Sequence, residues 1–383
     1  MKIKPFSTEH FFAKYEFSTP YQLCNSDCET VTINELMEMA EIPLENLGKL
    51  SLGYTETLGN SELREKIAET YSKIYRDDVI MLATPVEGIY LAARAILDPG
   101  DEVIVLSPAY DALINLFEHV VGTENVRNWD FVPGDTGWEL DYDQLDTLVS
   151  TKTKLLVVNF PHNPTGYLPT QNQFDKLIDW VERYDLFLFC DEMYFGLVHS
   201  GTDAIRSAVD LTKKAVILSG LSKTYGLPGL RTGWLIIQDE ELRKNIINWK
   251  FYTSICPPAP SEYLALVAWK RRDQLRNRSI AQIEHNLNLA NSFFDRWPEL
   301  FIWRKPIAGS TALVGMNVPS VMAYSVQLAE EAGVLILPAV TLGSDDQHMR
   351  MGFGRAAFGA ALERFEAYLI QDPNLQYQLA DNF

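Results

Sequence analysis

Cysteine is scarce in this sequence, and its few positions form no metal-binding pattern. The 383 residues include four cysteines, at Cys24, Cys28, Cys190 and Cys256. Cys24 and Cys28 have no matching pair of Cys or His residues nearby, so their spacing does not predict a zinc site. We therefore expect no metal site, and a reducing, intracellular setting in place of a disulfide-stabilised secreted one.

Basic residues are outnumbered as well. The chain has 33 Lys and Arg against 51 Asp and Glu, which gives a formal net charge of −18. Nucleic acids and anionic membranes bind basic surfaces, so we expect neither as a partner. An acidic exterior still leaves room for a local positive pocket that binds an anionic substrate.

Long apolar runs are missing. No segment approaches the length of a membrane span, and the stretch Met1–Pro5 does not begin a signal peptide. No Gly-x-Gly-x-x-Gly motif follows a predicted strand, which argues against an NAD-binding domain. These absences predict a cytoplasmic protein that does not bind NAD.

Short apolar runs alternate with helical patterns along the chain. Runs without polar alternation are typical of strands buried on both faces of a mainly parallel sheet. One stretch between them, Gln171–Tyr184, has a helical pattern and Thr170 as a candidate N-cap. The strand–helix–strand order predicts a doubly wound α/β domain. Its candidate strands are 103–106, 155–159, 186–190 and 215–218.

The length suits one large domain and one smaller domain. A further apolar run, 233–237, follows a loop too short for a helical crossover, so we expect this strand to run antiparallel. From about residue 285 the pattern changes to a long amphipathic helix over 282–297 and a terminal helix near 358–370. We predict a large domain at 46–284 and a smaller one made of 1–45 and 285–383.

Polar residues follow three of the predicted strands. Asn163 lies after 155–159, Asp191 and Tyr194 after 186–190, and Lys223 after 215–218. Taken singly, Asn-Pro-Thr-Gly is typical of a turn, an Asp of a helix cap and a Lys of the surface. Because ligands bind at the carboxyl ends of parallel strands, the ordered combination favours a functional site.

This combination resembles the class I/II aminotransferases, which are fold-type I enzymes dependent on pyridoxal 5'-phosphate (PLP). The resemblance runs from about Leu52 to Leu369. It implies a mostly parallel seven-stranded sheet with helices on both faces, a smaller α+β domain and bound PLP. The residues that carry it are Tyr54, Gly59, Leu63-Arg64, Pro99-Gly100-Asp101, Asn163-Pro164-Thr165-Gly166, Asp191, Tyr194, Ser222-Lys223, Arg231 and Arg350.

The resemblance implies specific roles around the cofactor ring. Lys223 would hold PLP as a Schiff base and carry the Cα proton of the substrate. Asp191 would pair with the pyridine nitrogen, which makes the ring an electron sink. Asn163 and Tyr194 would donate to the phenolic oxygen of the ring. Tyr110 would stack on the ring, although a core tyrosine at a helix start is an alternative reading.

The phosphate group would be held by Ser222 and Arg231, since a guanidinium suits phosphate. Tyr54 resembles the tyrosine that reaches the phosphate of a neighbouring subunit, which implies a homodimer with active sites at the subunit interface. Asn163 and Arg350 would bind the substrate, Arg350 through its α-carboxylate, and Arg355 competes for that role. The stretches 11–17 and 24–28 are expected at the substrate entrance.

Two positions depart from the family pattern at the phosphate. The usual Gly-rich turn is replaced by Ala83-Thr84-Pro85-Val86-Glu87-Gly88-Ile89, in which Pro85 has no N–H to donate. Thr84 and the N–H groups of Val86 and Glu87 remain candidate ligands. Gly220 stands where the family frequently has a hydroxyl. These differences indicate a divergent subgroup with an altered phosphate site.

Three functions are compatible with the fold. The first is transamination between an amino acid and a 2-oxo acid, in amino-acid biosynthesis. The second is a PLP-dependent lyase or cyclase, similar to capreomycidine synthase or aminocyclopropane-carboxylate synthase. The third is a non-catalytic effector domain of a transcription regulator. Lys223, Asp191, Tyr194 and Arg231 are all present and a basic helix-turn-helix segment is absent, which argues against the third.

Overall fold

The computed structural model describes residues 3–134 and 137–371. Its larger sheet has eight strands in the order β2-β9-β8-β7-β6-β3-β4-β5. Neighbouring strands from β8 to β4 run parallel, whereas β9 runs antiparallel to both β8 and β2. The strands are β2 (Val79–Leu82), β3 (Glu102–Ser107), β4 (Val126–Pro133), β5 (Trp138–Leu140), β6 (Thr153–Asn159), β7 (Phe187–Asp191), β8 (Ala215–Gly220) and β9 (Gly233–Ile237).

Two features of this sheet bear on the predictions. The antiparallel direction expected for 233–237 is confirmed, with Gly220 paired to Gly233 and Val216 to Ile237. Seven strands were expected, and the eighth is β5, a three-residue strand paired antiparallel with the end of β4. A run this short carries no periodicity that separates it from a loop.

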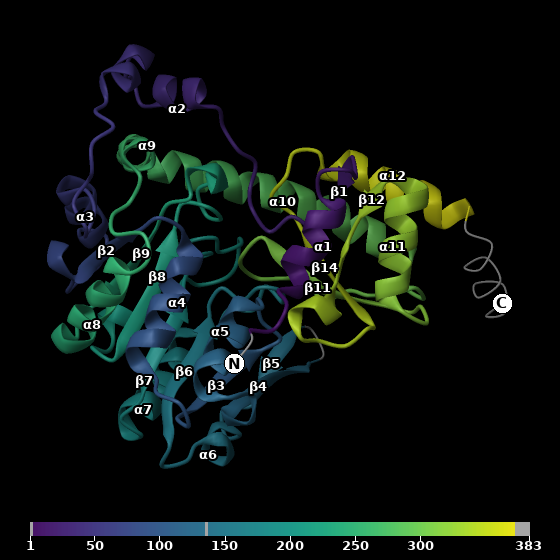
Figure 1. Cartoon of the computed structure of the whole chain (residues 1–383). Coiled ribbons are helices and arrows are strands. Elements are labelled where there is room, and N and C mark those ends of the chain that lie inside the picture. Colours follow the sequence, from purple (N-terminus) through teal and green to yellow (C-terminus); the bar gives the residue numbers. More distant parts are fainter. Residues whose placement is uncertain (1–2, 135–136, 372–383) are drawn as a thin grey trace.

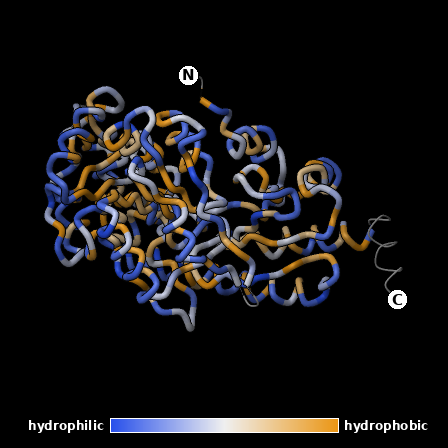
Figure 2. The backbone as a smooth tube through the Cα atoms, turned by 90° about the horizontal axis from the view of Figure 1, so that it is seen from below, coloured by the Kyte–Doolittle hydropathy of each residue, from blue (hydrophilic) through white to orange (hydrophobic). Residues whose placement is uncertain are grey.

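Helices cover both faces of the larger sheet (Figure 1). Along β6, Leu155 and Val157 point into one buried cluster, whereas Leu156 and Val158 point into the other. This alternation is the two-residue period of a strand buried on both faces, and Figure 2 shows hydrophobic segments running through the middle of this part of the molecule. The first cluster includes α4 (Pro85–Ile96), α5 (Ala112–Val121) and α8 (Glu240–Phe251), and the second includes α2 (Ile33–Met39), α3 (Ser61–Ala68), α6 (Leu145–Leu148), α7 (Gln171–Arg183) and α9 (Ala259–Trp269).

The predicted N-cap of α7 is confirmed. The Thr170 side chain accepts a hydrogen bond from the Gln173 N–H, and the Gln173 side chain accepts one from the Thr170 N–H, so two helix-end donors are satisfied. The short 3-10 segments are η1 (Leu44–Lys49), η2 (Arg76–Asp78), η3 (Thr123–Asn125), η4 (Ala208–Asp210), η5 (Pro228–Leu230) and η6 (Ala339–Leu342).

A smaller antiparallel sheet, in the order β10-β11-β14-β13, lies beside the larger one (Figure 1). Its strands are β10 (Phe301–Ile302), β11 (Thr311–Met316), β13 (Leu337–Pro338) and β14 (His348–Gly352), and the helices around it are α10 (Arg272–Arg296), α11 (Val321–Ala332) and α12 (Phe358–Gln371). The long helix thus begins earlier than predicted, at Arg272, and the terminal helix begins at Phe358 as predicted.

The N-terminal segment is shared between the two parts of the molecule. Helix α1 (Ser7–Tyr15) contacts η6, and β1 (Tyr21–Gln22) pairs in parallel with β12 (Val334–Leu335). Helix α2 instead packs against α9. The domain boundaries at residues 45 and 284 stay a prediction. In the part of the chain that the structure describes, no helix is both long and apolar enough to cross a membrane.

Candidate active site

The carboxyl ends of β6, β7 and β8 open into a cavity of about 420 Å³. The α1 helix and residues 25–27 form its opposite wall, and Arg350 of β14 also lines it. The structure brings most of the predicted site residues to this one cavity. They are Val86, Tyr110, Asn163, Asp191, Tyr194, Ser222, Lys223, Arg231 and Arg350.

The ends of β6 and β7 are tied together by Asn159, which sequence reasoning did not select. Its side-chain amide donates to the Asp191 carbonyl at 2.7 Å, and its Oδ1 accepts from the Asn163 N–H at 2.7 Å. Three residues further on, Gly166 has φ +68° and leaves no room for a Cβ against Pro306. The Asn-Pro-Thr-Gly motif is therefore a tight turn that fixes Asn163 in the cavity wall.

Asp191 is the last residue of β7 and is buried. Burial raises the pKa of its carboxyl group to about 7, while a hydrogen bond from the Met193 N–H and the positive charge of Lys223 act in the opposite direction. That hydrogen bond joins Met193 N to Asp191 Oδ1 at 2.9 Å. A cationic partner in the cavity would stabilise the ionised carboxylate.

Lys223 follows β8 and reaches across the cavity to the N-terminal segment. Its Nζ donates a hydrogen bond to the Ser26 hydroxyl at 2.8 Å. Burial lowers the pKa of Lys223, and the nearby Arg350 guanidinium lowers it as well, whereas Asp27 raises it. A lowered pKa increases the fraction of unprotonated amine, which is the form that reacts with a carbonyl carbon.

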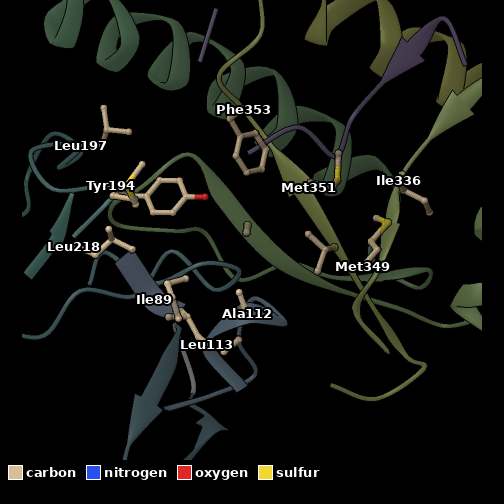
Figure 3. Close-up of a cluster of buried hydrophobic side chains, with 14 of the residues drawn as sticks. Ile89, Ala112, Leu113, Tyr194, Leu197, Leu218, Ile336, Met349, Met351 and Phe353 are labelled. Carbon is tan, nitrogen blue, oxygen red and sulfur yellow. The ribbon is translucent and has the colours of Figure 1, made fainter. Parts of the chain in front are cut away.

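Tyr194 belongs to the buried core beneath the cavity. Figure 3 shows its ring among Leu197 and Leu218 of the sheet domain, with Phe353 on the side of the smaller sheet, and all four residues belong to one apolar cluster. Burial raises the pKa of the Tyr194 phenol well above its usual range. The hydroxyl therefore stays protonated at neutral pH and is available as a hydrogen-bond donor.

Ser222 and Arg231, the predicted phosphate ligands, both line the cavity. The Ser222 residue is 5% exposed, and its hydroxyl has no hydrogen-bond partner among the residues of the described ranges. Arg231 has a left-handed backbone, with φ 52°, and its Nη2 donates to the Thr84 hydroxyl at 2.9 Å. Thr84 thus contacts the site through Arg231 without lining the cavity itself. A buried hydroxyl and an exposed guanidinium are suitable donors to a phosphate.

The two departures at the phosphate have structural explanations. Pro85 is the first residue of α4, where a missing N–H costs nothing. A Cβ at Gly220 would lie 2.9 Å from the Thr232 carbonyl oxygen and 3.1 Å from the Gly233 Cα, so β9 leaves no space for a hydroxyl side chain there.

Two other predicted residues are not brought to the cavity. The Glu87 N–H donates to the Thr84 carbonyl, and its carboxylate accepts from the Ala83 N–H and the Thr253 hydroxyl. Neither group of Glu87 therefore faces the site. Tyr54 is 94% exposed, on the surface of this chain.

Arg350 and Arg355 differ sharply in their surroundings. Arg350 is 2% exposed; its Nη2 donates to the Cys24 carbonyl at 2.9 Å, and its Nη1 lies 3.3 Å from Asn163 Oδ1. Its Nε is buried without a partner among the residues that the structure covers. Arg355 lies outside the cavity lining and pairs with Asp27, Nη2 to Oδ2, at 2.7 Å. The free donor in the cavity belongs to Arg350.

The two N-terminal stretches expected at the entrance contribute Phe12, Glu16 and residues 25–27 to the cavity. Sequence reasoning did not select Thr8 or Glu9, which also line it, nor the contact of Ser26 with Lys223. Two glycines in the sequence could have indicated that the N-terminal segment lies close to β14. At Gly352 and Gly354 a Cβ would collide with the backbone of residues 25–28, so these glycines let the N-terminal segment lie against the chain around β14.

The residues of the cavity fit PLP. The end of β7 supplies a buried carboxyl group, and the segment after β8 supplies both an amine with a lowered pKa and a buried hydroxyl without a partner in the described part of the chain. Arg231, which also lines the cavity, adds positive charge. These are the partners required by an aldehyde, a ring nitrogen and a phosphate on one planar molecule.

Comparisons with known proteins agree with this chemistry. Residues 21–365 match the family model for aminotransferase class I and II. The chain is similar to capreomycidine synthase of Streptomyces vinaceus, with 28% identity over 90% of this chain and 88% of the relative. It is also similar to a probable aspartate aminotransferase of Methanocaldococcus jannaschii, with 26% identity over 85% and 88%. A PLP-dependent aminotransferase structure from Streptococcus suis superposes with a TM-score of 0.90 at 23% identity, covering 97% of this chain and 99% of the other.

Proposed function

This chain belongs to the aminotransferase class I and II family and uses PLP, and we propose that it moves an amino group between an amino acid and a 2-oxo acid with Lys223 at the reacting centre. One observation carries the proposal. Asn163, Asp191 and Lys223, from three strand ends, line one cavity in which a buried hydroxyl and a buried guanidinium nitrogen have no partner among the residues of the described ranges.

Lys223 holds the cofactor covalently and moves the proton of the substrate. Bound PLP supplies an electron sink for the electron pair released when the Cα–H bond breaks. The Nζ of Lys223 accepts the Cα proton as a general base, which requires the unprotonated amine that burial favours. Ser26, hydrogen-bonded to this Nζ, orients it.

Asp191, Asn163 and Tyr194 bind the ring. The Asp191 carboxylate pairs with the protonated ring nitrogen, and this partner removes the unfavourable burial of a lone carboxylate. Asn163 and Tyr194 donate to the phenolic oxygen. Tyr110, which lines the cavity and whose hydroxyl donates to Glu9, would pack against the ring.

The phosphate is bound by the Ser222 hydroxyl, the Arg231 guanidinium and the N-terminus of α4, through the N–H of Val86. Thr84 positions Arg231. Tyr54, which is exposed on this chain, would reach the phosphate of a second copy in a homodimeric enzyme.

The substrate α-carboxylate is held by Arg350. The guanidinium is buried beside Asn163 and retains a free Nε, which suits a carboxylate entering the cavity. Arg355 acts indirectly, since it neutralises Asp27 at the cavity wall. The enzyme works in the cytoplasm, in amino-acid biosynthesis; its four cysteines are all free, as suits a reducing compartment.

A lyase or cyclase is the second candidate, favoured by the similarity to capreomycidine synthase over 90% of this chain. It uses the same proton abstraction by Lys223 and differs in the group that leaves or the ring that closes.

One experiment separates the two. The PLP-loaded protein is mixed with single amino acids, without any oxo acid, and its products are quantified. An aminotransferase releases one 2-oxo acid per site and accumulates pyridoxamine phosphate. Ammonia, an eliminated group or a cyclic product formed over many turnovers, without pyridoxamine phosphate, would establish the lyase or cyclase instead.

A further inference from the structure

The wall of the cavity opposite the sheet is one face of α1. Glu9, Phe12 and Glu16 are spaced three and four residues apart, so they lie on the same side of the helix, and all three line the cavity. The neighbouring face buries Phe11 and Tyr15 in a separate apolar cluster. This packing fixes the rotation of α1, and with it the direction in which the two carboxylates point.

Among the carboxylates that line the cavity, Glu16 differs from the others because it has no partner within the described residues. Asp27 pairs with Arg355 at 2.7 Å, and Glu9 accepts a hydrogen bond from the Tyr110 hydroxyl at 2.9 Å. Asp191 is matched by the ring nitrogen of the cofactor in the proposed function. Within residues 3–134 and 137–371, no side chain pairs with the half-buried Glu16 carboxylate.

The electrostatic surroundings of Glu16 favour a cation next to it. Burial raises the pKa of its carboxyl group, and the charges of Asp27 and Glu9 raise it further. Arg355 and Lys223 act in the opposite direction, but Arg355 is already bound to Asp27 and Lys223 is used by the cofactor. A positive group entering the cavity would relieve the repulsion among the three carboxylates.

The same cavity has a separate anchor for the substrate carboxylate. The Arg350 residue is 2% exposed and its buried Nε has no partner in the described part of the chain. Arg231 and Arg350 are the arginines that line the cavity, and the proposed function assigns them to the phosphate and the α-carboxylate. No further arginine among the described lining residues is left for a second substrate carboxylate, which would instead meet Glu16.

We propose that the substrate is an amino acid with a cationic side chain, an amine or a guanidinium, and that Glu16 binds this cation. The inference rests on the proposed function and names its substrate class. Glu16 is a specificity-determining residue: it contacts the far end of the substrate and takes no part in proton transfer.

The first test measures kcat/KM of the PLP-loaded enzyme for arginine, lysine and ornithine and for their neutral counterparts citrulline and norleucine. The native enzyme is expected to prefer the cationic set, and Glu16→Gln to reduce that preference by about 10- to 100-fold, the effect of losing a hydrogen-bonded charge pair. Glu363→Gln, at an exposed site on α12, is the matched control and leaves the preference unchanged.

The second test does not depend on turnover. Calorimetry compares binding of 5-guanidinopentanoate with binding of hexanoate, which share a carboxylate and lack the reactive α-amine. The guanidino compound is expected to bind more tightly to the native holoenzyme, with the difference lost in Glu16→Gln and kept in Glu363→Gln.

The outcomes separate this inference from the proposed function. If amino acids are converted but neutral or acidic ones are preferred, or the preference survives Glu16→Gln, the substrate inference is wrong while the proposed function stands. If no amino acid is converted and Glu16 still governs binding of the guanidino compound, the proposed function fails and the cation site stands.

Discussion

The two walls of the cavity differ in how they are built. The cofactor wall consists of residues that lie within a few positions of the ends of β6, β7 and β8, so the fold places them together as soon as the sheet forms. The substrate wall consists of α1 and residues 25–27, which reach the site through packing against the chain around β14 and η6. The first wall is specified locally, and the second depends on contacts between distant segments.

This difference in construction corresponds to a difference in chemistry. In the proposed function, the cofactor wall supplies the groups that every reaction of this cofactor requires: an amine, a carboxyl group and phosphate donors. The substrate wall holds acidic side chains on a helix face that can change without disturbing the sheet. Substitutions in the cofactor wall should therefore lower the rate for every substrate, whereas substitutions of the α1 carboxylates should change which substrate is used.

The largest effect is expected for Lys223→Ala. Turnover should be abolished for all amino acids, because the group that binds the cofactor covalently and moves the Cα proton is removed. Activity assays and the visible absorbance of the reconstituted protein measure the two losses. An unchanged far-UV circular dichroism spectrum is the control for folding, and retained activity would disprove the role of Lys223.

Asp191→Ala should lower kcat by about 10²- to 10³-fold, the size of effect seen when one preorganised electrostatic partner of a developing charge is removed. The loss should be equal for cationic and neutral amino acids, because Asp191 lies at the cofactor wall. Steady-state kinetics with both kinds of substrate check this. A loss confined to one kind would contradict the division between the two walls.

The same division explains what the sequence could predict. Asn163, Asp191, Tyr194 and Lys223 were located because each follows an apolar run, and that order in sequence becomes proximity in a parallel sheet. Glu9 and Ser26 were not located individually, since nothing near them in the sequence indicates that α1 would face Lys223. The structure was also needed to see that position 220 has no room for a hydroxyl side chain, because the start of β9 lies too close.

Fine choices between neighbours depended on tertiary contacts too. Arg350 and Arg355 are close in sequence, but Asp27, more than three hundred residues earlier, pairs with Arg355, and of the two arginines only Arg350 lines the cavity. Glu87 lies next to Val86 in α4, but a bond to the Thr84 carbonyl already uses its N–H. Such assignments follow from hydrogen-bond partners, which a single sequence does not contain.

Two arginine variants test which of Arg350 and Arg355 binds the substrate carboxylate directly. Arg350→Ala should raise KM for all amino acids by about 10- to 100-fold, because a charged hydrogen-bonding partner of the carboxylate is lost. Arg355→Ala should have a smaller effect on KM, since it leaves the direct contact in place and only frees Asp27. Kinetics of both variants test this, and a larger KM increase for Arg355→Ala would reverse the assignment.

A last expected effect is on the stability of the apoprotein instead of on turnover, and it has opposite signs at the two walls. Burial raises the pKa of Asp191 to about 7 in the folded chain, above the ordinary value of about 4 in the unfolded chain. The folded state therefore binds a proton that the unfolded state has released, and stability falls as the pH rises from about 4 to about 7, by up to about 1.4 kcal/mol per pH unit.

Asp191→Asn should remove this part of the pH dependence and make the apoprotein more stable than the native apoprotein at pH 8, although the variant is nearly inactive. Glu192, whose pKa burial raises to about 8, retains a slope of the same sign. Asp27→Asn should instead lower stability, because Asp27 is paired with Arg355. Thermal unfolding of the three apoproteins between pH 5 and pH 8 measures this. If Asp191→Asn lost stability at pH 8 as Asp27→Asn does, the Asp191 carboxylate would already be stabilised without the cofactor, and its proposed pairing with the ring nitrogen would lose its physical basis.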